Sequence, residues 1–87
     1  MQQLDTAVLV NRSRHILAAF LAIEIQTGVT FVELARTRQG TPRHPQLKAN
    51  AISAARAVER LKARVPESAR EEIDTGLYDL KRRILMI

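Results

Sequence analysis

The 87-residue chain contains no cysteine, which excludes disulfide bridges and thiolate metal sites. It has only two histidines, His15 and His44, which lie far apart in the sequence. A zinc site needs three or four converging ligands, and no HExxH pattern or similar cluster supplies them. A GxSxG segment and a glycine-rich phosphate loop are also lacking. The sequence therefore predicts no metal, no cofactor and no catalytic activity.

Long apolar runs are also lacking. The most apolar stretch covers residues 16–25, reads ILAAFLAIEI and includes Glu24. A membrane-spanning helix needs about 20 predominantly apolar residues. We therefore expect a cytoplasmic chain without a membrane span.

Glycine and proline are scarce, at three residues each, and they divide the chain cleanly. Gly40, Pro42 and Pro45 fall within residues 39–45, which predicts a loop. Pro66 predicts a second break, because proline disfavours helical geometry at the residue before it. The remaining segments, 4–38, 46–65 and 67–86, show helical periodicity and no strand alternation. The sequence predicts an all-α fold, a single helical domain over residues 1–87: a three-helix antiparallel bundle with a long first helix.

The first helix is apolar around more than half of its circumference. Asp5 or Ser13 could cap its start, and Gly28 could interrupt it, but we expect one continuous helix. At about 100° per residue, one face gathers six side chains: Leu9, Ile16, Phe20, Ile23, Phe31 and Leu34. The arc is then extended by Val10, Leu17, Leu21, Ile25 and Val32. Such a helix must be covered on more than one side, which predicts a homodimer.

The two later helices each carry one apolar stripe. In the second helix it comprises Leu47, Ala51, Ala54, Val58, Leu61 and Val65. In the third helix it comprises Ala69, Ile73, Leu77, Leu80, Ile84 and Ile87. Pro66 suits the first turn of the third helix, or Ser68 and Glu71 could instead form a capping box there. Both helices are therefore expected to pack one face against the first.

Glu24 is the unusual residue of the first helix, since its wheel position lies inside the apolar arc. A buried carboxylate is costly unless it is paired. We expect Glu24 to be a buried carboxylate in a structural ion pair, or else to reach solvent near Gly28. An acid/base role facing a ligand is the functional alternative.

Positive charge is concentrated in the middle of the chain. The net charge is +5, and residues 36–64 hold eight basic residues against Glu59 alone. Arg56, Arg60 and Arg64 form a ridge on the second helix. This ridge could contact phosphates, or the acidic first half of the third helix. The tentative anion or nucleic-acid contacts are Arg36, Arg38, Arg43, Arg56, Arg60 and Arg64. Aromatic residues make up only 3% of the chain, which disfavours base stacking.

Taken together, these patterns predict a small, non-catalytic helical interaction module whose partner is a second copy or another protein. The alternative is a basic accessory protein that contacts a nucleic-acid backbone. A third hypothesis is an enzyme that uses Glu24 and nearby arginines on an anionic substrate.

Overall fold

Three α-helices and one short 3₁₀-helix make up the part of the chain that the computed structural model describes, residues 6–87. They are α1 (Thr6–Thr37), α2 (His44–Leu61), η1 (Lys62–Arg64) and α3 (Glu67–Ile84). No strand occurs within residues 6–87. The all-helical prediction is therefore confirmed, with three α-helices of which the first is the longest.

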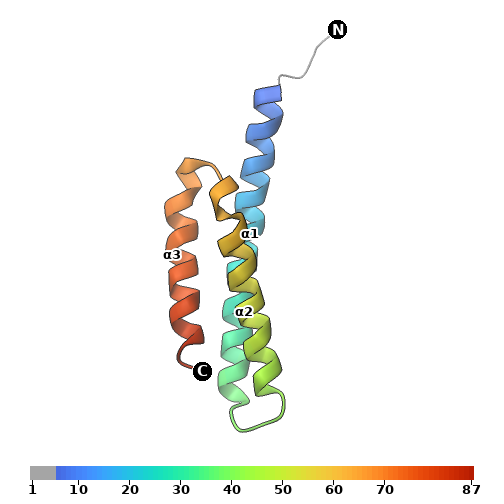
Figure 1. The fold of residues 1–87 in the computed structure, drawn as a ribbon, viewed down its shortest axis with the longest axis vertical. Helices are drawn as coiled ribbons and strands as arrows, with labels where there is room; N and C mark the ends of the chain where they lie inside the picture. Colours follow the sequence, from blue (N-terminus) through green and yellow to red (C-terminus); the bar gives the residue numbers. More distant parts are fainter. Residues whose placement is uncertain (1–5) are drawn as a thin grey trace.

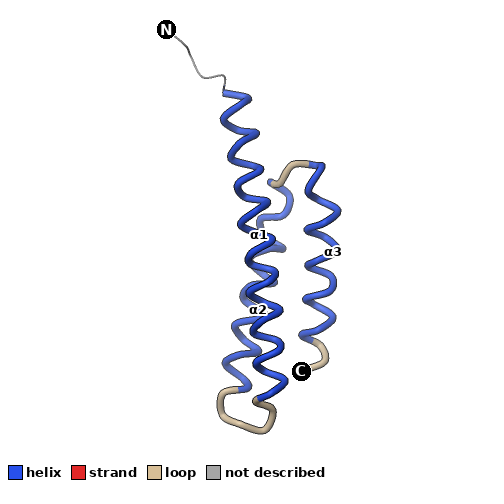
Figure 2. Tube along the Cα trace, turned by 180° about the vertical axis from the view of Figure 1, so that it is seen from behind, coloured by secondary structure: helices blue, strands red, loops and turns tan. Residues whose placement is uncertain are grey.

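The three helices lie side by side and alternate in direction along the chain (Figure 1). Each helix contacts both of the others, and α1 contacts α2 most extensively. The opposite view shows the loop after α1 at one end and the connection into α3 at the other (Figure 2). The first turns of α1 project beyond the ends of α2 and α3 (Figure 1).

The helix ends follow the punctuation that the sequence predicted. Gly40 turns the chain after α1 with a φ of 80°, a conformation that L side chains rarely adopt. Pro45 occupies the first turn of α2, where its missing N–H costs nothing. The second helix ends earlier than expected, at Leu61, and η1 follows. Val65 is extended before Pro66, as proline requires, so the preceding residues tighten into a 3₁₀ turn.

Two expectations about capping have different outcomes. Pro66 precedes α3, and no side-chain hydrogen bond caps the helix, so the Ser68–Glu71 capping box is wrong. Instead, the Arg70 guanidinium donates to the carbonyls of Ala63 and Val65, at 3.2 and 3.5 Å, and ties α3 to η1. For α1, the expected cap Asp5 lies outside the described residues. The alternative cap, Ser13, lies inside α1, so a helix that begins at Ser13 is wrong.

Gly28 faces both other helices, and α1 passes through it without a break. A Cβ built on Gly28 would lie 2.7 Å from Leu80 Cδ2 of α3 and 3.3 Å from Ala54 Cβ of α2. The glycine therefore allows both neighbours to approach the backbone of α1. The core around it is formed by apolar side chains of all three helices, including Leu21, Val32, Ala51, Ala55, Val58, Ile73, Leu77 and Leu80.

Candidate interaction surface

The helix α1 carries two apolar stripes on different sides, and the three-helix unit covers only one of them. The inner stripe packs into the core or against it: Leu17, Leu21, Ile25, Gly28, Val32 and Ala35. The outer stripe stays exposed: Leu9, Ile16, Phe20, Ile23 and Leu34. The face that gathered most apolar side chains in the sequence is thus mainly the one left in solvent.

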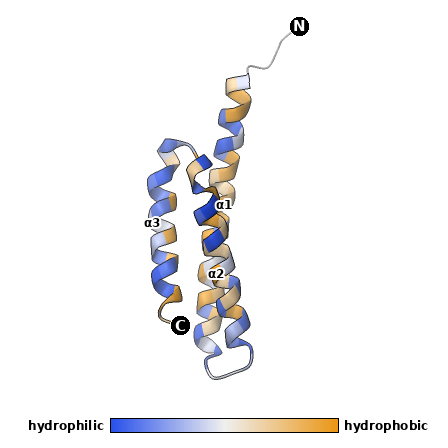
Figure 3. Ribbon diagram, in the orientation of Figure 1, coloured by the Kyte–Doolittle hydropathy of each residue, from blue (hydrophilic) through white to orange (hydrophobic). Residues whose placement is uncertain are grey.

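The outer stripe is exposed to an extent that is unusual for side chains of this size. Ile16 and Ile23 are each 63% exposed, and Phe20 is 49% exposed. Every residue from Thr6 to Ile16 is exposed, and the first turns of α1 project beyond the ends of α2 and α3. Figure 3 shows hydrophobic and hydrophilic bands alternating along this projecting part of α1. Large exposed apolar patches of this kind mark interaction sites in soluble proteins.

By length and composition, α1 is also able to cross a membrane. The sequence favours no span, because the apolar stretch 16–25 is short and its extension to Ala35 adds Gln26, Gly28 and Glu33, but the continuous helix covers 32 residues. Core helices of soluble proteins and signal sequences meet the same requirement, so length and composition do not identify what surrounds α1.

The expectation that Glu24 is buried is wrong. Its side chain is partly exposed, and residues 6–87 contain no buried charged side chain. Glu24 escapes burial because it lies on the border between the two stripes, where α2 and α3 cover one side only. None of the salt bridges in the described structure includes Glu24. Because Glu24 lies on this border, a helical-wheel projection that treats the two stripes as one apolar arc places Glu24 inside that arc.

The six candidate arginines do not converge on one site. Arg36 is near the end of α1, Arg38 and Arg43 lie in the loop, and Arg56 and Arg60 lie on α2. Arg64 lies in η1. All six are exposed, and none takes part in a salt bridge within residues 6–87. The arginine ridge on α2 therefore has no ion-pair partner on the acidic half of α3 in the same chain.

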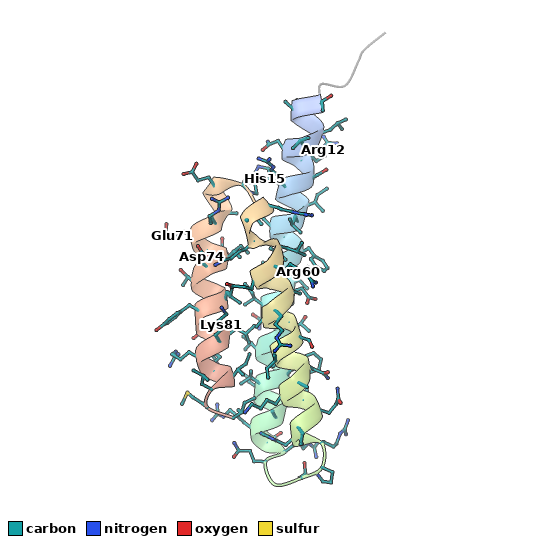
Figure 4. The ribbon with its side chains drawn as sticks, in the orientation of Figure 1. Arg12, His15, Arg60, Glu71, Asp74 and Lys81 are labelled. Atoms are coloured by element: carbon teal, nitrogen blue, oxygen red, sulfur yellow. The ribbon has the colours of Figure 1, made fainter. Side chains whose placement is uncertain are left out.

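Other charged groups form ion pairs that link α3 to α2 and to η1. Lys62 Nζ lies 3.1 Å from Asp74 Oδ1, and Lys81 Nζ lies 3.1 Å from Glu59 Oε2. The hydrogen bond from Lys62 to Asp74 raises the Lys62 pKa above its ordinary value. Figure 4 labels Asp74 and Lys81 on α3 and Arg60 on α2. The first bridge links η1 to α3. The second links α2 to α3, two helices that have fewer contacts with each other than either has with α1.

Four surface hollows adjoin arginines of the candidate set, two of them at Arg36. One, of about 410 Å³, lies between α2 and α3 and is mostly apolar: Ile52, Ala55, Arg56, Glu59, Lys81, Ile84 and Leu85. Another, of about 600 Å³, lies between the start of α1 and η1: Leu9, Val10, Ser13, Arg14, Leu17, Ala63 and Arg64. Glu24 lines none of the four, so none of them brings it beside an arginine. No cluster of three or more His, Asp or Glu able to hold a metal ion occurs in the described residues.

Comparison of the chain with models of known protein families, with curated proteins and with solved structures gives no match.

Proposed function

We propose that this chain is a non-catalytic protein-interaction module that self-associates as a homodimer through the outer stripe of α1. On this view the three helices form an antiparallel bundle in each copy, and the outer stripe is the face between copies. The observation that supports the proposal most strongly is the exposure of five large apolar side chains along one line of a single helix.

The energetic reason is the cost of leaving these side chains in water. Moving such a side chain from full exposure to full burial gains about 1.5–3 kcal/mol. Each of these side chains is 42–63% exposed and gains part of that free energy when a partner covers it. An 87-residue chain has little stability to spare, because small domains bury a smaller fraction of their surface than large ones. A second copy offers the same stripe as a partner, which a two-fold symmetric contact requires.

The test is a charge placed in the middle of the outer stripe. Ile23→Glu puts a carboxylate where the partner would bury it, and an unpaired buried charge is strongly unfavourable. We expect the variant to sediment as a monomer at concentrations where the unmodified chain is dimeric. Tyr78→Glu is the matched control, because Tyr78 is 72% exposed on α3 and away from the stripe.

Two outcomes contradict the proposal. A wild-type chain that is monomeric at every concentration tested removes the homodimer. Equal loss of association in Ile23→Glu and Tyr78→Glu places the contact elsewhere. Circular dichroism of both variants shows whether each remains helical, so that unfolding is not mistaken for dissociation.

The alternative, contact with a nucleic-acid backbone, is favoured by one observation. The six candidate arginines are exposed and free of salt bridges within the described structure, so their charge is available to phosphates. Binding of this kind weakens steeply with salt. Failure to bind a generic duplex at low salt would remove this alternative.

A further inference from the structure

The outer stripe is part of a longer line of residues along α1, in which small polar residues occupy the positions between the apolar ones. Ser13, Thr27 and Thr30 fall between its apolar members, and together they form a line with alternating steps of four and three residues. We call this line the seam: Leu9, Ser13, Ile16, Phe20, Ile23, Thr27, Thr30 and Leu34. Such spacing is that of the positions that meet in a two-stranded coiled coil.

The polar members do not prevent the seam from packing against another helix. Thr30 Oγ1 donates to the carbonyl of Gln26 at 3.1 Å, so its hydroxyl is satisfied within α1. Its methyl group remains available for an apolar contact. Ser13 and Thr27 are small enough to face larger side chains from a partner.

We infer that two copies pair through this seam with their α1 helices antiparallel. The inference rests on the proposed homodimer and adds the direction and register of its contact. One register places Leu9 opposite Leu34 of the partner, and Ser13 opposite Thr30. It also places Ile16 opposite Thr27, and Phe20 opposite Ile23.

This register overlaps the whole of α1. The helix runs from Thr6 to Thr37, so its midpoint lies between Leu21 and Ala22. The two-fold axis of the antiparallel register passes through the same point. Every seam residue therefore has a partner. The 32-residue helices overlap over about 48 Å, and the seam from Leu9 to Leu34 covers about 39 Å of this length.

Charge at the edges of the seam favours the antiparallel direction. Arg12 lies beside the seam near one end of α1, and Glu33 lies on the same side near the other end. In the antiparallel register each Arg12 reaches Glu33 of the partner, which gives two symmetric pairs. In a parallel pair, Arg12 would face Leu17 instead. Glu33 would face Arg38, which lies beyond the end of α1 at Thr37.

Side-chain size and helix dipoles favour the same direction. A parallel pair would place two Phe20 rings in one layer, with Ser13, Thr27 and Thr30 each facing its own copy. In the antiparallel register, Phe20 instead packs against Ile23 of the other copy, and Ser13 packs against Thr30 of the other copy. It also places the positive end of each α1 dipole beside the negative end of the other.

Arg83 is a second basic group near Glu33. The hydrogen bond to Asp79 raises the Arg83 pKa above its ordinary value, and the charge of Glu33 adds a smaller effect in the same direction. No salt bridge joins them among the described residues. Glu33 is exposed, and its carboxylate can interact with a second cation from the partner.

Disulfide trapping tests the direction directly, because the chain has no cysteine of its own. Leu9→Cys and Leu34→Cys are prepared as separate proteins, mixed at equal concentration under reducing conditions and then oxidised. Disulfide-linked peptides are identified by mass after digestion. We expect the 9–34 cross-link to form in large excess over 9–9 and 34–34.

The other outcomes separate the two proposals. Predominant 9–9 and 34–34 cross-links indicate a parallel pair, which overturns this inference and leaves the homodimer in place. Cross-linking no greater than that of a Tyr78→Cys control, together with a monomeric mass for the wild-type chain, overturns both.

A charge reversal tests the edge pairs independently. We expect Arg12→Glu to raise the dimer dissociation constant several-fold, because it places two carboxylates together at each end of the interface. Arg14→Glu is the control, since it makes the same change two residues away, in the hollow beside η1. Equal effects of the two variants would overturn the assignment of Arg12 to the interface.

Discussion

At the scale of the residue, Gly28 shows how closely the three helices approach one another. Leu80, the side chain nearest to it, is fully buried, so it has little room to move away from an added methyl group. The two other glycines differ from Gly28. Gly40 supplies a positive φ in the loop, and a Cβ on Gly76 would meet only Ile25, at 3.1 Å.

We expect Gly28→Ala to lower the thermal midpoint by several degrees. Overpacking a core costs about 1–3 kcal/mol. The better helix propensity of alanine returns about 1 kcal/mol. Gly76→Ala has the same advantage in helix propensity. The added methyl group would meet only Ile25, which is partly exposed and can shift, so the thermal midpoint of this variant should stay the same or rise. Thermal unfolding of both variants checks this, and a rise for Gly28→Ala as large as that for Gly76→Ala would contradict the packing described.

Single residues also show what the sequence could not settle. Gly28 looked like a possible helix breaker, because a glycine required by close packing and a glycine that ends a helix are identical in one sequence. Glu24 looked buried for a related reason. Its wheel position was assigned correctly, but its exposure depends on which neighbouring stripe is covered, and that is decided by α2 and α3.

At the scale of the element, the last turns of α3 are held by a carboxylate between two guanidiniums. Asp79 Oδ2 accepts from Arg83 Nε at 2.7 Å, and Asp79 Oδ1 accepts from Arg82 at 3.0 Å. The hydrogen bond from Arg83, and then that from Arg82, lowers the Asp79 pKa below its ordinary value of 3.8. These bonds link residues three and four positions apart, which stabilises the end of the helix.

We expect Asp79→Asn to lower the thermal midpoint at neutral pH by a small amount, and the difference from wild type to close in acid. A carboxylate whose folded pKa is depressed stabilises the fold above its unfolded pKa, and this stabilisation is lost as pH falls through the folded pKa. The two melting curves should therefore converge below about pH 3.8. Glu72→Gln is the control on the same helix, with no salt bridge in the described structure to lose. A difference in thermal midpoint between wild type and Asp79→Asn that persists unchanged in acid would contradict the role given to Asp79.

The number and order of the helices could be predicted, because Gly40, Pro45 and Pro66 punctuate the chain at their boundaries. The single stripes of α2 and α3 also identified their buried faces correctly through Ala51, Val58, Ile73 and Leu80. The face that α1 turns inward could not be predicted. Both of its stripes are apolar, and the choice between them depends on the close contact at Gly28, which a hydropathy pattern does not contain.

At the scale of the whole molecule, the surface has two distinct regions. An apolar line follows the outer side of α1, while exposed arginines are scattered over the loop, α2 and η1. The sequence indicated both regions, but it did not show that the arginines fail to converge or that α3 leaves the ridge unpaired. The first region is the stronger candidate for function, because its members lie on one continuous helix face.

The central claim is that one copy of this chain does not cover α1 and that a second copy does. Sedimentation equilibrium of the full chain in aqueous buffer, over a range of micromolar concentrations, measures this directly. The account predicts a mass that approaches twice the 9.8 kDa of one chain and falls toward 9.8 kDa on dilution. A folded, helical chain that stays at 9.8 kDa at every concentration would contradict it.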